Sequence, residues 1–301
     1  MSKNRKKTTI SVIMPVFNGA RFLAEAIESI LKQSFKDFEL IIVNDASTDN
    51  SEKIIKSFLK KDKRIKLLNN KQNLGESASA NVGFKAAQAK YIARMDQDDI
   101  AHPDRFAKQV YFLDHNPDHI LVATQGHIID ENKQVVGHKL FPLDHETIYK
   151  EYGNFHPILH PSIMVRRSLL PDQKKLWTDQ LSSADDYMTL FTLLMNGKFA
   201  NLPEKLIYYR LHSNNNSMKN VRAKFINSLR VRYYAIRDLG YPVNIKMLIL
   251  MLMQSAYILF LPEWLSIGTY LVLKGMKPFD LAFPFIARFK GSWKQLATTV
   301  S

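Results

Sequence analysis

The 301-residue sequence contains no cysteine, which excludes disulfide bonds and thiolate metal sites. It also contains no internal repeat and no low-complexity linker. Its first apolar segment, residues 10–14, is too short for the core of a signal peptide and is interpreted as the first strand of a cytoplasmic protein. The net charge of +14 is not accompanied by a recognisable nucleic-acid motif, so nucleic acid is not expected as a partner.

A hydrophobic run long enough to span a membrane is also missing. Residues 247–261 are apolar except for Gln254 and Ser255, and as a helix they cover about 22 Å, short of the roughly 30 Å hydrocarbon core of a bilayer. Pro262 breaks the run before residues 264–273 resume it. We therefore expect a hairpin of two helices that is buried or dips into one leaflet.

The C-terminal third of the chain is basic. From Lys219 to the end it has twelve Lys and Arg residues against Asp238, Glu263 and Asp280. Apolar side chains at helical spacing near the end predict an amphipathic helix lying in the membrane plane. These features indicate a peripheral protein at the anionic inner face of the cell membrane. The alternative is that these helices pack on the rest of the chain or form a homo-oligomer. The apolar face consists of Phe285, Ile286, Phe289, Trp293 and Leu296.

Strand and helix patterns alternate through the first hundred residues, which predicts an α/β protein built from parallel βαβ units. Each unit is short and closed by a polar turn, as in one nucleotide-binding half of a doubly wound sheet. The predicted strands are 10–14, 38–43, 65–68 and 91–95, and the predicted helices are 19–33, 49–59 and 77–89. Beyond residue 100 the predicted helices are 103–116, 186–195 and 221–239, and the predicted strands are 120–124, 127–129, 162–165 and 206–211.

Four aspartates follow two of the predicted strands: Asp45 after the second, and Asp96, Asp98 and Asp99 after the fourth. Open α/β sheets bind their ligands at the carboxyl ends of strands. Clustered carboxylates need a cation between them, and their hard oxygen atoms select Mg²⁺ or Mn²⁺. Asp96 and Asp98 share one side of an extended chain, while Gln97 points away. The two runs predict a metal–diphosphate site; the alternative for either run alone is a solvated acidic turn.

A turn with an aromatic residue ends the first strand. In the run of residues 15–19, Phe17 is able to stack on a base, and Gly19 lets the chain turn closely into the next helix. Asp45 is placed to accept the imide N–H of a uracil. The alternative is an ordinary strand-to-helix turn. A further polar turn and a helix start that face the ligand are expected from Asn73, Gly75 and Asn81.

Together these motifs resemble the family 2 glycosyltransferases of the GT-A fold. The resemblance covers residues 8–215 and includes a later acidic pair, Asp185-Asp186, where the family usually has Glu-Asp. It implies a nucleotide-sugar donor, usually linked to UDP, a Mn²⁺ or Mg²⁺ ion held by the Asp-x-Asp motif, and inversion at the anomeric carbon. The motifs occur in the family's order and comprise residues 15–19, 44–49, 73–75, Asn81, 96–99 and 185–186.

The resemblance also implies an architecture. We expect the GT-A nucleotide-diphospho-sugar transferase fold, with a Rossmann-like, mostly parallel sheet, in residues 1–216. Its nucleotide-binding half would cover about 8–100 and its acceptor half about 101–216. Residues 217–301 would form the basic, apolar helical extension.

Individual roles follow from the same resemblance. Phe17 and Asp45 would bind the base, Asp96 the ribose or the shell of the metal, and Asp98 the metal itself. Asp186 would be the general base that takes the proton from the acceptor hydroxyl. The alternative for Asp186 is a capping role at a helix N-terminus, which is compatible with catalysis.

A closing loop resembling that of the family contains the last candidates. Arg210 would reach the diphosphate, and His212 would reach the metal, the alternative for His212 being a structural role. The sequence departs from the family at Ala80, where many members have arginine, and at Ala89-Lys90, which replaces a frequent Gly-Glu. The other implied donor-binding positions are Pro15, Asn18, Asn73, Gly75, Asn81 and Arg94.

The sequence therefore predicts an inverting glycosyltransferase of the bacterial surface-polysaccharide type. It would move a hexose from a UDP-sugar to a hydroxyl of a lipid-linked glycan, in O-antigen, capsule or exopolysaccharide synthesis. The alternative is a catalytically silent relative that binds a nucleotide sugar and acts as an assembly partner at the membrane. A nucleotidyltransferase is disfavoured because residues 15–19 lack a glycine-rich loop with a basic residue.

Overall fold

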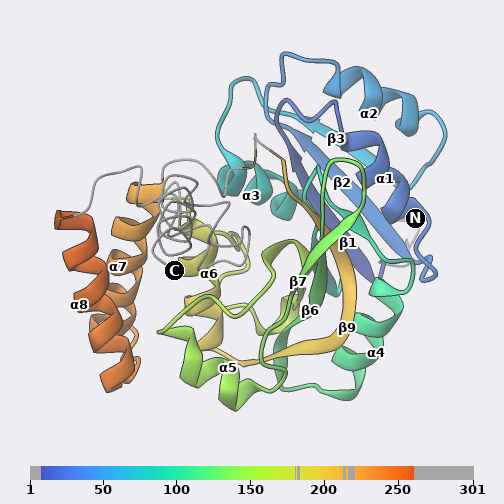
Figure 1. The fold of residues 1–301 in the computed structure, drawn as a ribbon. Coiled ribbons are helices and arrows are strands. Elements are labelled where there is room, and N and C mark those ends of the chain that lie inside the picture. Colours follow the sequence, from blue (N-terminus) through green and yellow to red (C-terminus); the bar gives the residue numbers. More distant parts are fainter. Residues whose placement is uncertain (1–7, 180, 182–183, 213–214, 216–220, 261–301) are drawn as a thin grey trace, which may run out of the picture. The chain divides into compact units, whose positions relative to one another are not determined.

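A computed structural model describes residues 8–179, 181, 184–212, 215 and 221–260 of the chain (Figure 1). The chain forms two compact units, one made of Met1–Leu211 with Val231–Pro242 and the other of His212–Arg230 with Val243–Ser301. The helices expected at 264–273 and around 285–296 lie outside the described residues. The domain boundary expected at residue 216 stays a prediction.

The first half of the larger unit is a parallel sheet in the order β3-β2-β1-β4, which is half of a doubly wound arrangement. Every residue of β1, β2 and β4 is buried, as expected for strands that helices cover on both faces. The predicted alternation is confirmed. The strands are β1 (Ile10–Val16), β2 (Phe38–Asn44), β3 (Ile65–Asn69) and β4 (Tyr91–Arg94), and the helices are α1 (Leu23–Leu31), α2 (Ser51–Leu59) and α3 (Glu76–Ala86).

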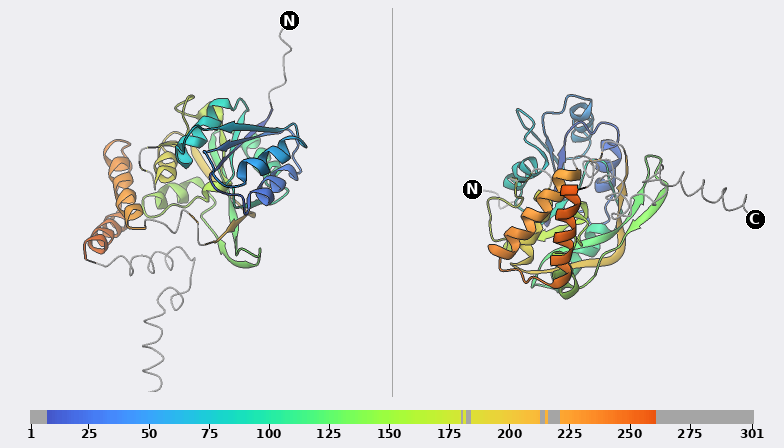
Figure 2. Two further views of the ribbon diagram at one scale, coloured as in Figure 1. Left: turned by 90° about the horizontal axis from the view of Figure 1, so that it is seen from above. Right: turned by 60° about the vertical axis from the view of Figure 1, so that its left-hand side comes forward.

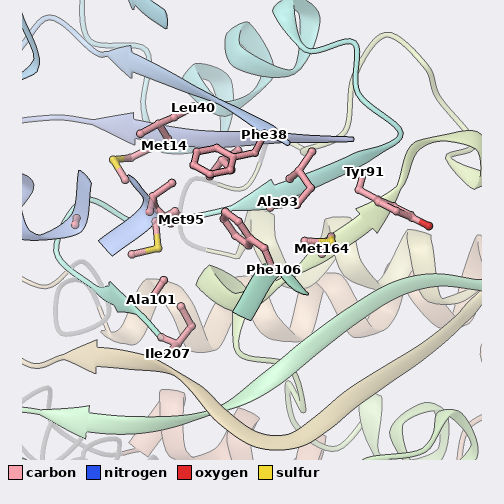
Figure 3. Close-up of a cluster of buried hydrophobic side chains, with 14 of the residues drawn as sticks. Met14, Phe38, Leu40, Tyr91, Ala93, Met95, Ala101, Phe106, Met164 and Ile207 are labelled. Atoms are coloured by element: carbon pink, nitrogen blue, oxygen red, sulfur yellow. The ribbon is translucent and has the colours of Figure 1, made fainter. Parts of the chain in front are cut away.

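Helices α1 and α2 lie on one face of this sheet and α3 lies on the other (Figure 1). The core on the first face continues into the second half of the unit, because Phe106 of α4 (Arg105–His115) packs edge to face on Phe38, with 5.7 Å between ring centroids (Figure 3). Full burial of such a side chain stabilises the fold by about 1.5–3 kcal/mol. The two halves therefore share one core, which fixes the carboxyl ends of the strands. Figure 3 labels Met14, Phe38, Leu40, Tyr91, Ala93, Met95, Ala101, Phe106, Met164 and Ile207 of this core.

The second half of the sheet is mixed. Strand β8 pairs antiparallel with β4, β6 follows it, β9 runs parallel to β6, and β5 closes the edge. The expected α/β class with a mostly parallel sheet in its first half is confirmed. The bounds are β5 (Ile100–Ala101), β6 (His119–Ile129), β8 (Met164–Arg166), β9 (Lys198–Arg210), α6 (Asp185–Leu194) and the short 3-10 helices His160–Ser162 and Arg167–Leu169.

One detail of the sequence prediction is wrong in this half. The strands expected at 120–124 and 127–129 form one continuous strand, β6, with irregular pairing at Gln125. The expected gap between these strands contains Gln125, whose side chain is buried and bonds both backbone groups of Phe141, accepting from N–H at 2.7 Å and donating to C=O at 2.9 Å. A long-range partner thus satisfies this buried amide.

Strand β5 and the two short 3-10 helices were not predicted from the sequence, and neither were the two elements that follow β6. Strand β7 (Val135–Lys139) pairs with β6 to form a hairpin that extends beyond the sheet (Figure 2), and α5 (His145–Tyr152) follows it. Asp144 caps α5, its Oδ1 accepting from the Thr147 N–H at 2.9 Å. The β7 side chains include exposed Val135 and Val136, so its pattern lacked the alternation of a half-buried strand.

The smaller unit contains α8 (Ile245–Phe260), and α7 (Val221–Arg237) contributes residues to both units. Gln254, which interrupts the apolar run, donates to Ser228 Oγ at 2.7 Å and to the Phe225 carbonyl at 3.1 Å, so it joins α8 to the first part of α7. Within the described residues, no helix has the length and apolarity needed to cross a membrane.

Candidate active site

The predicted site residues gather where β1, β2 and β4 end, since these three strands are neighbours in a parallel sheet. The turn after β1 carries Phe17, the turn after β2 carries Asp45, and the acidic run 96–99 follows β4. Phe17 is 44% exposed although it is large and apolar, which suits a ring that stacks on a ligand. Pro15 is buried within β1, opposite Val43 of β2.

Hydrogen bonds to side chains join the turns after β1 and β2. Asn18 has a left-handed backbone conformation (φ 49°), its Oδ1 accepts from the Thr48 N–H at 2.8 Å, and its own N–H donates to Ser47 Oγ at 3.1 Å. The Gly19 N–H donates to Ser51 Oγ at 2.9 Å. Asn18 therefore shapes the turn that presents Phe17, and its predicted contact with the donor stays a prediction.

Asp45 binds side-chain and backbone groups of the segment that leads into α3. Its carboxylate is buried, with Oδ1 accepting from Asn70 Nδ2 and the Leu74 N–H, both at 2.8 Å, and Oδ2 accepting from the Gly75 N–H at 2.9 Å. Asn73 Oδ1 also accepts from the Gly75 N–H, at 3.1 Å. Gly75 has a φ of +88°, a backbone conformation that is strained for any residue with a side chain. These oxygens shape the turn before α3, and the expected contact between Asp45 and a base stays a prediction.

Asn81 is buried and binds backbone groups of the protein, and its expected contact with the donor stays a prediction. Its Nδ2 donates to the Trp177 carbonyl at 2.7 Å and its Oδ1 accepts from the Trp177 N–H at 2.9 Å. The amide thus holds a segment 96 residues further along the chain. Trp177 is in turn buried beside the site, its Nε1 donating to His160 Nε2 at 3.3 Å.

Arg94 orients the first carboxylate of the acidic run. Its guanidinium is 2% exposed, with Nε donating to Asp96 Oδ1 at 2.9 Å and another nitrogen to Glu76 Oε1 at 2.6 Å, and it lies 5.7 Å from the Trp177 ring centroid. A charge-assisted bond of this kind fixes both partners. Arg94 therefore reaches the site through Asp96, and its own contact with the donor stays a prediction.

Arg210 is buried against the backbone of the acidic run. Its side chain is 1% exposed, with Nε donating to the Asp98 carbonyl at 2.8 Å and another nitrogen to Glu25 Oε2 at 2.7 Å. Its backbone N–H donates to Asp99 Oδ1 at 2.9 Å. Arg210 is the last residue of β9, and from this buried position it donates hydrogen bonds to Asp98 and Asp99. The expected contact between Arg210 and the diphosphate stays a prediction.

Asp99 carries the supporting role that its alternation with Asp96 and Asp98 suggests. It is 1% exposed. Burial raises the pKa of Asp99 well above its usual range, and the negative charges of Asp98 and Asp96 raise it further. Three carboxylates are thus crowded together at the end of β4.

This crowding fits a divalent cation. Hard carboxylate oxygens from Asp96 and Asp98 are the donor set that Mg²⁺ and Mn²⁺ prefer. No cluster of three or more His, Cys, Asp or Glu side chains able to hold a metal occurs among the described residues. Mg²⁺ is commonly held by one or two carboxylates together with substrate phosphates, so two are sufficient. His212 belongs to the smaller unit, and its role as a ligand stays a prediction.

The acidic pair begins α6. Asp185 is buried and its Oδ1 accepts from the Leu181 N–H at 2.8 Å, whereas Asp186 is half-buried and its Oδ1 accepts from the Tyr187 N–H at 2.8 Å. The helix N-cap is Ala184, which makes no side-chain capping bond. Asp185 therefore anchors the preceding loop, and Asp186 is the more exposed of the two carboxylates.

His160 is linked to the acidic run through Trp177 and Arg94. Burial lowers the pKa of His160 and the positive charge of Arg94 lowers it further, while the negative charges of Asp186 and Asp96 oppose the shift. Trp177 Nε1 donates to His160 Nε2 at 3.3 Å, and the Trp177 ring lies 5.7 Å from the guanidinium of Arg94, which binds Asp96. The position of Asp186 relative to the donor stays a prediction.

Several residues of this arrangement were not foreseen. Glu76 pairs with the buried Arg94 and Glu25 with the buried Arg210, and Asn70 binds both Asp45 and Ser79 Oγ, the latter at 2.8 Å. Trp177 gave no local signal because its partners are distant in sequence. Gln97, between two aspartates, was expected to turn away from them, and it turns toward Phe17.

Comparison with known proteins identifies the family. The sequence model of glycosyl transferase family 2 matches residues 11–172, and the chain therefore belongs to this family. An uncharacterized glycosyltransferase of Haemophilus influenzae is 32% identical over 250 residues, which are 78% of this chain and 77% of that protein.

Two solved structures are similar in fold. TarS of S. aureus (residues 1–349, in complex with UDP-GlcNAc) has a TM-score of 0.67 at 19% identity, over 87% of this chain and 80% of that chain. The mannosyltransferase PcManGT from Pyrobaculum calidifontis, in complex with GDP-Man and Mn²⁺, has a TM-score of 0.60 at 15% identity, over 95% of this chain and 81% of that chain. The fold is thus the GT-A type of glycosyltransferase.

Proposed function

We propose that the protein is a metal-dependent, inverting glycosyltransferase. It moves a hexose from a UDP-sugar to a hydroxyl group of a lipid-linked surface glycan. The observation that carries the proposal is that the exposed Phe17 ring and the acidic run with Asp96 and Asp98 lie at the ends of neighbouring parallel strands, joined by the Gln97 bonds to Phe17. The UDP-GlcNAc bound by TarS and the Mn²⁺ and GDP-Man bound by PcManGT support a nucleotide-sugar donor and a divalent ion.

The donor would lie along the ends of β1, β2 and β4. The exposed ring of Phe17 stacks on the base, and Asp98 with Asp96 holds the divalent ion. When bound, this ion neutralises negative charge on the diphosphate leaving group. Arg94 keeps Asp96 in place through the 2.9 Å bond to Oδ1.

Asp186 performs the proton transfer in this proposal. The acceptor oxygen attacks the anomeric carbon from the face opposite the diphosphate, and the bond between this carbon and the phosphate oxygen breaks. Its electron pair leaves with the diphosphate, and the acceptor's proton passes to the Asp186 carboxylate. Attack from the opposite face inverts the anomeric centre.

Donor hydrolysis tests the metal site. In Asp98→Asn, Mn²⁺-dependent hydrolysis of UDP-sugars by the purified protein is expected to fall by about 10²-fold or more, because electrostatic stabilisation of the leaving group is lost. Screening a panel of nucleotide sugars identifies the donor in the same assay.

Asp104→Asn is the matched control, since this aspartate is half exposed and makes no capping bond at the start of α4. It is expected to leave hydrolysis unchanged. Undiminished hydrolysis by Asp98→Asn would sink the assignment. Metal-dependent UDP binding by the wild-type chain without turnover of any donor would instead favour the silent assembly partner.

The membrane part of the proposal rests on α8. This helix exposes apolar side chains, among them Leu252, Leu259 and Phe260, which are 62%, 73% and 81% exposed, within a basic segment of the chain. The full chain is expected to float with anionic vesicles, less with neutral ones, and less again at high salt, because surface charge is screened.

Leu252→Gln combined with Phe260→Gln removes apolar area without altering charge, and this variant should bind the anionic vesicles more weakly. If the wild-type chain stays unbound at low salt and the variant changes only the oligomeric state in sedimentation, the helix is an interface between copies.

A further inference from the structure

Gln97 links the acidic run to the turn that carries Phe17. Its Oε1 accepts from the Phe17 N–H at 2.9 Å and its Nε2 donates to the Phe17 carbonyl at 3.1 Å. The side-chain amide thereby pairs with both backbone groups of a residue 80 positions earlier in the chain. Asp96 and Asp98, its neighbours on either side, are the proposed carboxylates of the metal site.

Gly19 makes room for this contact. A Cβ atom added at residue 19 would lie 2.6 Å from the Gln97 Cδ atom and closer still to its Oε1, which no real contact tolerates. The close approach of the Gln97 amide therefore explains the glycine. On its other side the turn is held by the bond from the Thr48 N–H to Asn18 Oδ1, so the Phe17 backbone is fixed while its ring stays exposed.

We propose that Gln97 is a positioning residue that sets the distance between the Phe17 ring and the Asp96 and Asp98 carboxylates. This inference rests on the proposed function, in which one nucleotide sugar contacts both ends of the link. Its base and its diphosphate are joined covalently, so the two contacts form together only when their spacing matches the donor. A preset spacing lowers the cost of ordering both ends at once.

The expected signature is a loss of donor binding with the chemical step preserved. Gln97→Met keeps the length of the side chain and removes both hydrogen bonds. It should raise the KM for the UDP-sugar, and the Kd for UDP in the presence of Mn²⁺, by about 5–30-fold, the effect of one to two modest interactions. The kcat and the melting temperature should stay close to those of the wild-type chain, since the contact is exposed.

A double-mutant cycle separates positioning from general damage. In the Phe17→Ala background there is no ring to position, so adding Gln97→Met should change the UDP Kd by less than about 2-fold. Titration with Mn²⁺ alone should give the same affinity for the wild-type chain and Gln97→Met.

Gly19→Ala supplies an independent variant. It should reproduce the weaker UDP binding of Gln97→Met, because the new Cβ atom displaces the Gln97 amide. Added to Gln97→Ala, Gly19→Ala should have no further effect on UDP binding, because no side-chain amide remains for the Cβ atom to overlap.

Each outcome bears on a different claim. UDP binding that is unchanged in Gln97→Met, effects that add in the Phe17→Ala background, or a parallel loss of Mn²⁺ affinity would overturn the inference while leaving the proposed function intact. Failure of the wild-type chain to bind UDP with Mn²⁺ would overturn the proposed function and this inference with it.

Discussion

Asp186→Asn is expected to lower the kcat for donor turnover by about 10²–10⁴-fold, the usual contribution of a general base. The amide has nearly the same shape but does not take up the proton of the attacking hydroxyl or water. The bond that Asp186 Oδ1 accepts from the Tyr187 N–H is retained by the amide oxygen, so the start of α6 should remain folded. The measurement is UDP release from the UDP-sugar found in the panel, with UDP affinity measured alongside.

UDP affinity should stay near the wild-type value, because Asp186 acts on the acceptor side. Asp179→Asn is the matched control: this aspartate is in the loop before α6 and forms an ion pair with Lys175 at 2.6 Å. Wild-type turnover by Asp186→Asn would show that another group takes the proton. A capping role alone predicts that outcome, together with a lower melting temperature.

Arg210→Leu is expected to destabilise the folded protein by about 3–5 kcal/mol, the cost of removing one partner from a buried charge network. The change leaves Glu25 without this partner and the Asp98 carbonyl without its donor, and it removes a positive charge that opposes the raised pKa of Asp99. For a unit of this size the melting temperature should fall by about 6–20 °C. Chemical denaturation gives the free energy directly.

Arg21→Leu is the control, because Arg21 is 63% exposed and its ion pair with Glu131 lies at the surface. Its effect should stay below about 1 kcal/mol. The same pair of variants distinguishes a buried structural position of Arg210 from a position in contact with the diphosphate. If Arg210→Leu retains wild-type stability and only raises the KM for the donor, the side chain reaches the diphosphate, as the resemblance implies.

Much of the fold could be predicted from the sequence because the relevant signals are local. Continuous apolar stretches such as residues 38–43, each followed by a polar turn and a helical pattern, specify parallel strands covered on both faces. The sequence therefore predicts where these strands end, and it predicts that the aspartates after them lie at the carboxyl edge of the sheet. The gap expected between residues 124 and 127 was wrong because the continuity of the strand depends on a non-local contact: the Gln125 amide bonds the backbone of Phe141, and the strand continues through this residue.

The use of each polar side chain depended on the tertiary structure. The hydrogen bonds of Asp45, Asn81 and Arg210 run to protein groups 25–30, 95–96 and 79 or more positions away, and their predicted contacts with the donor stay predictions. A loop side chain turns toward whichever partner the fold brings near it, and no local pattern records that partner.

The sequence by itself determined that this chain belongs among the family 2 glycosyltransferases and placed its carboxylates at the ends of strands, because order along the chain and local periodicity are enough for both. Only the tertiary structure decided which of the polar residues hold the site together. It buried Arg210 beneath Asp98, turned Asn81 toward Trp177 and brought Gln97 to Phe17, because those partners meet only when the sheet is assembled.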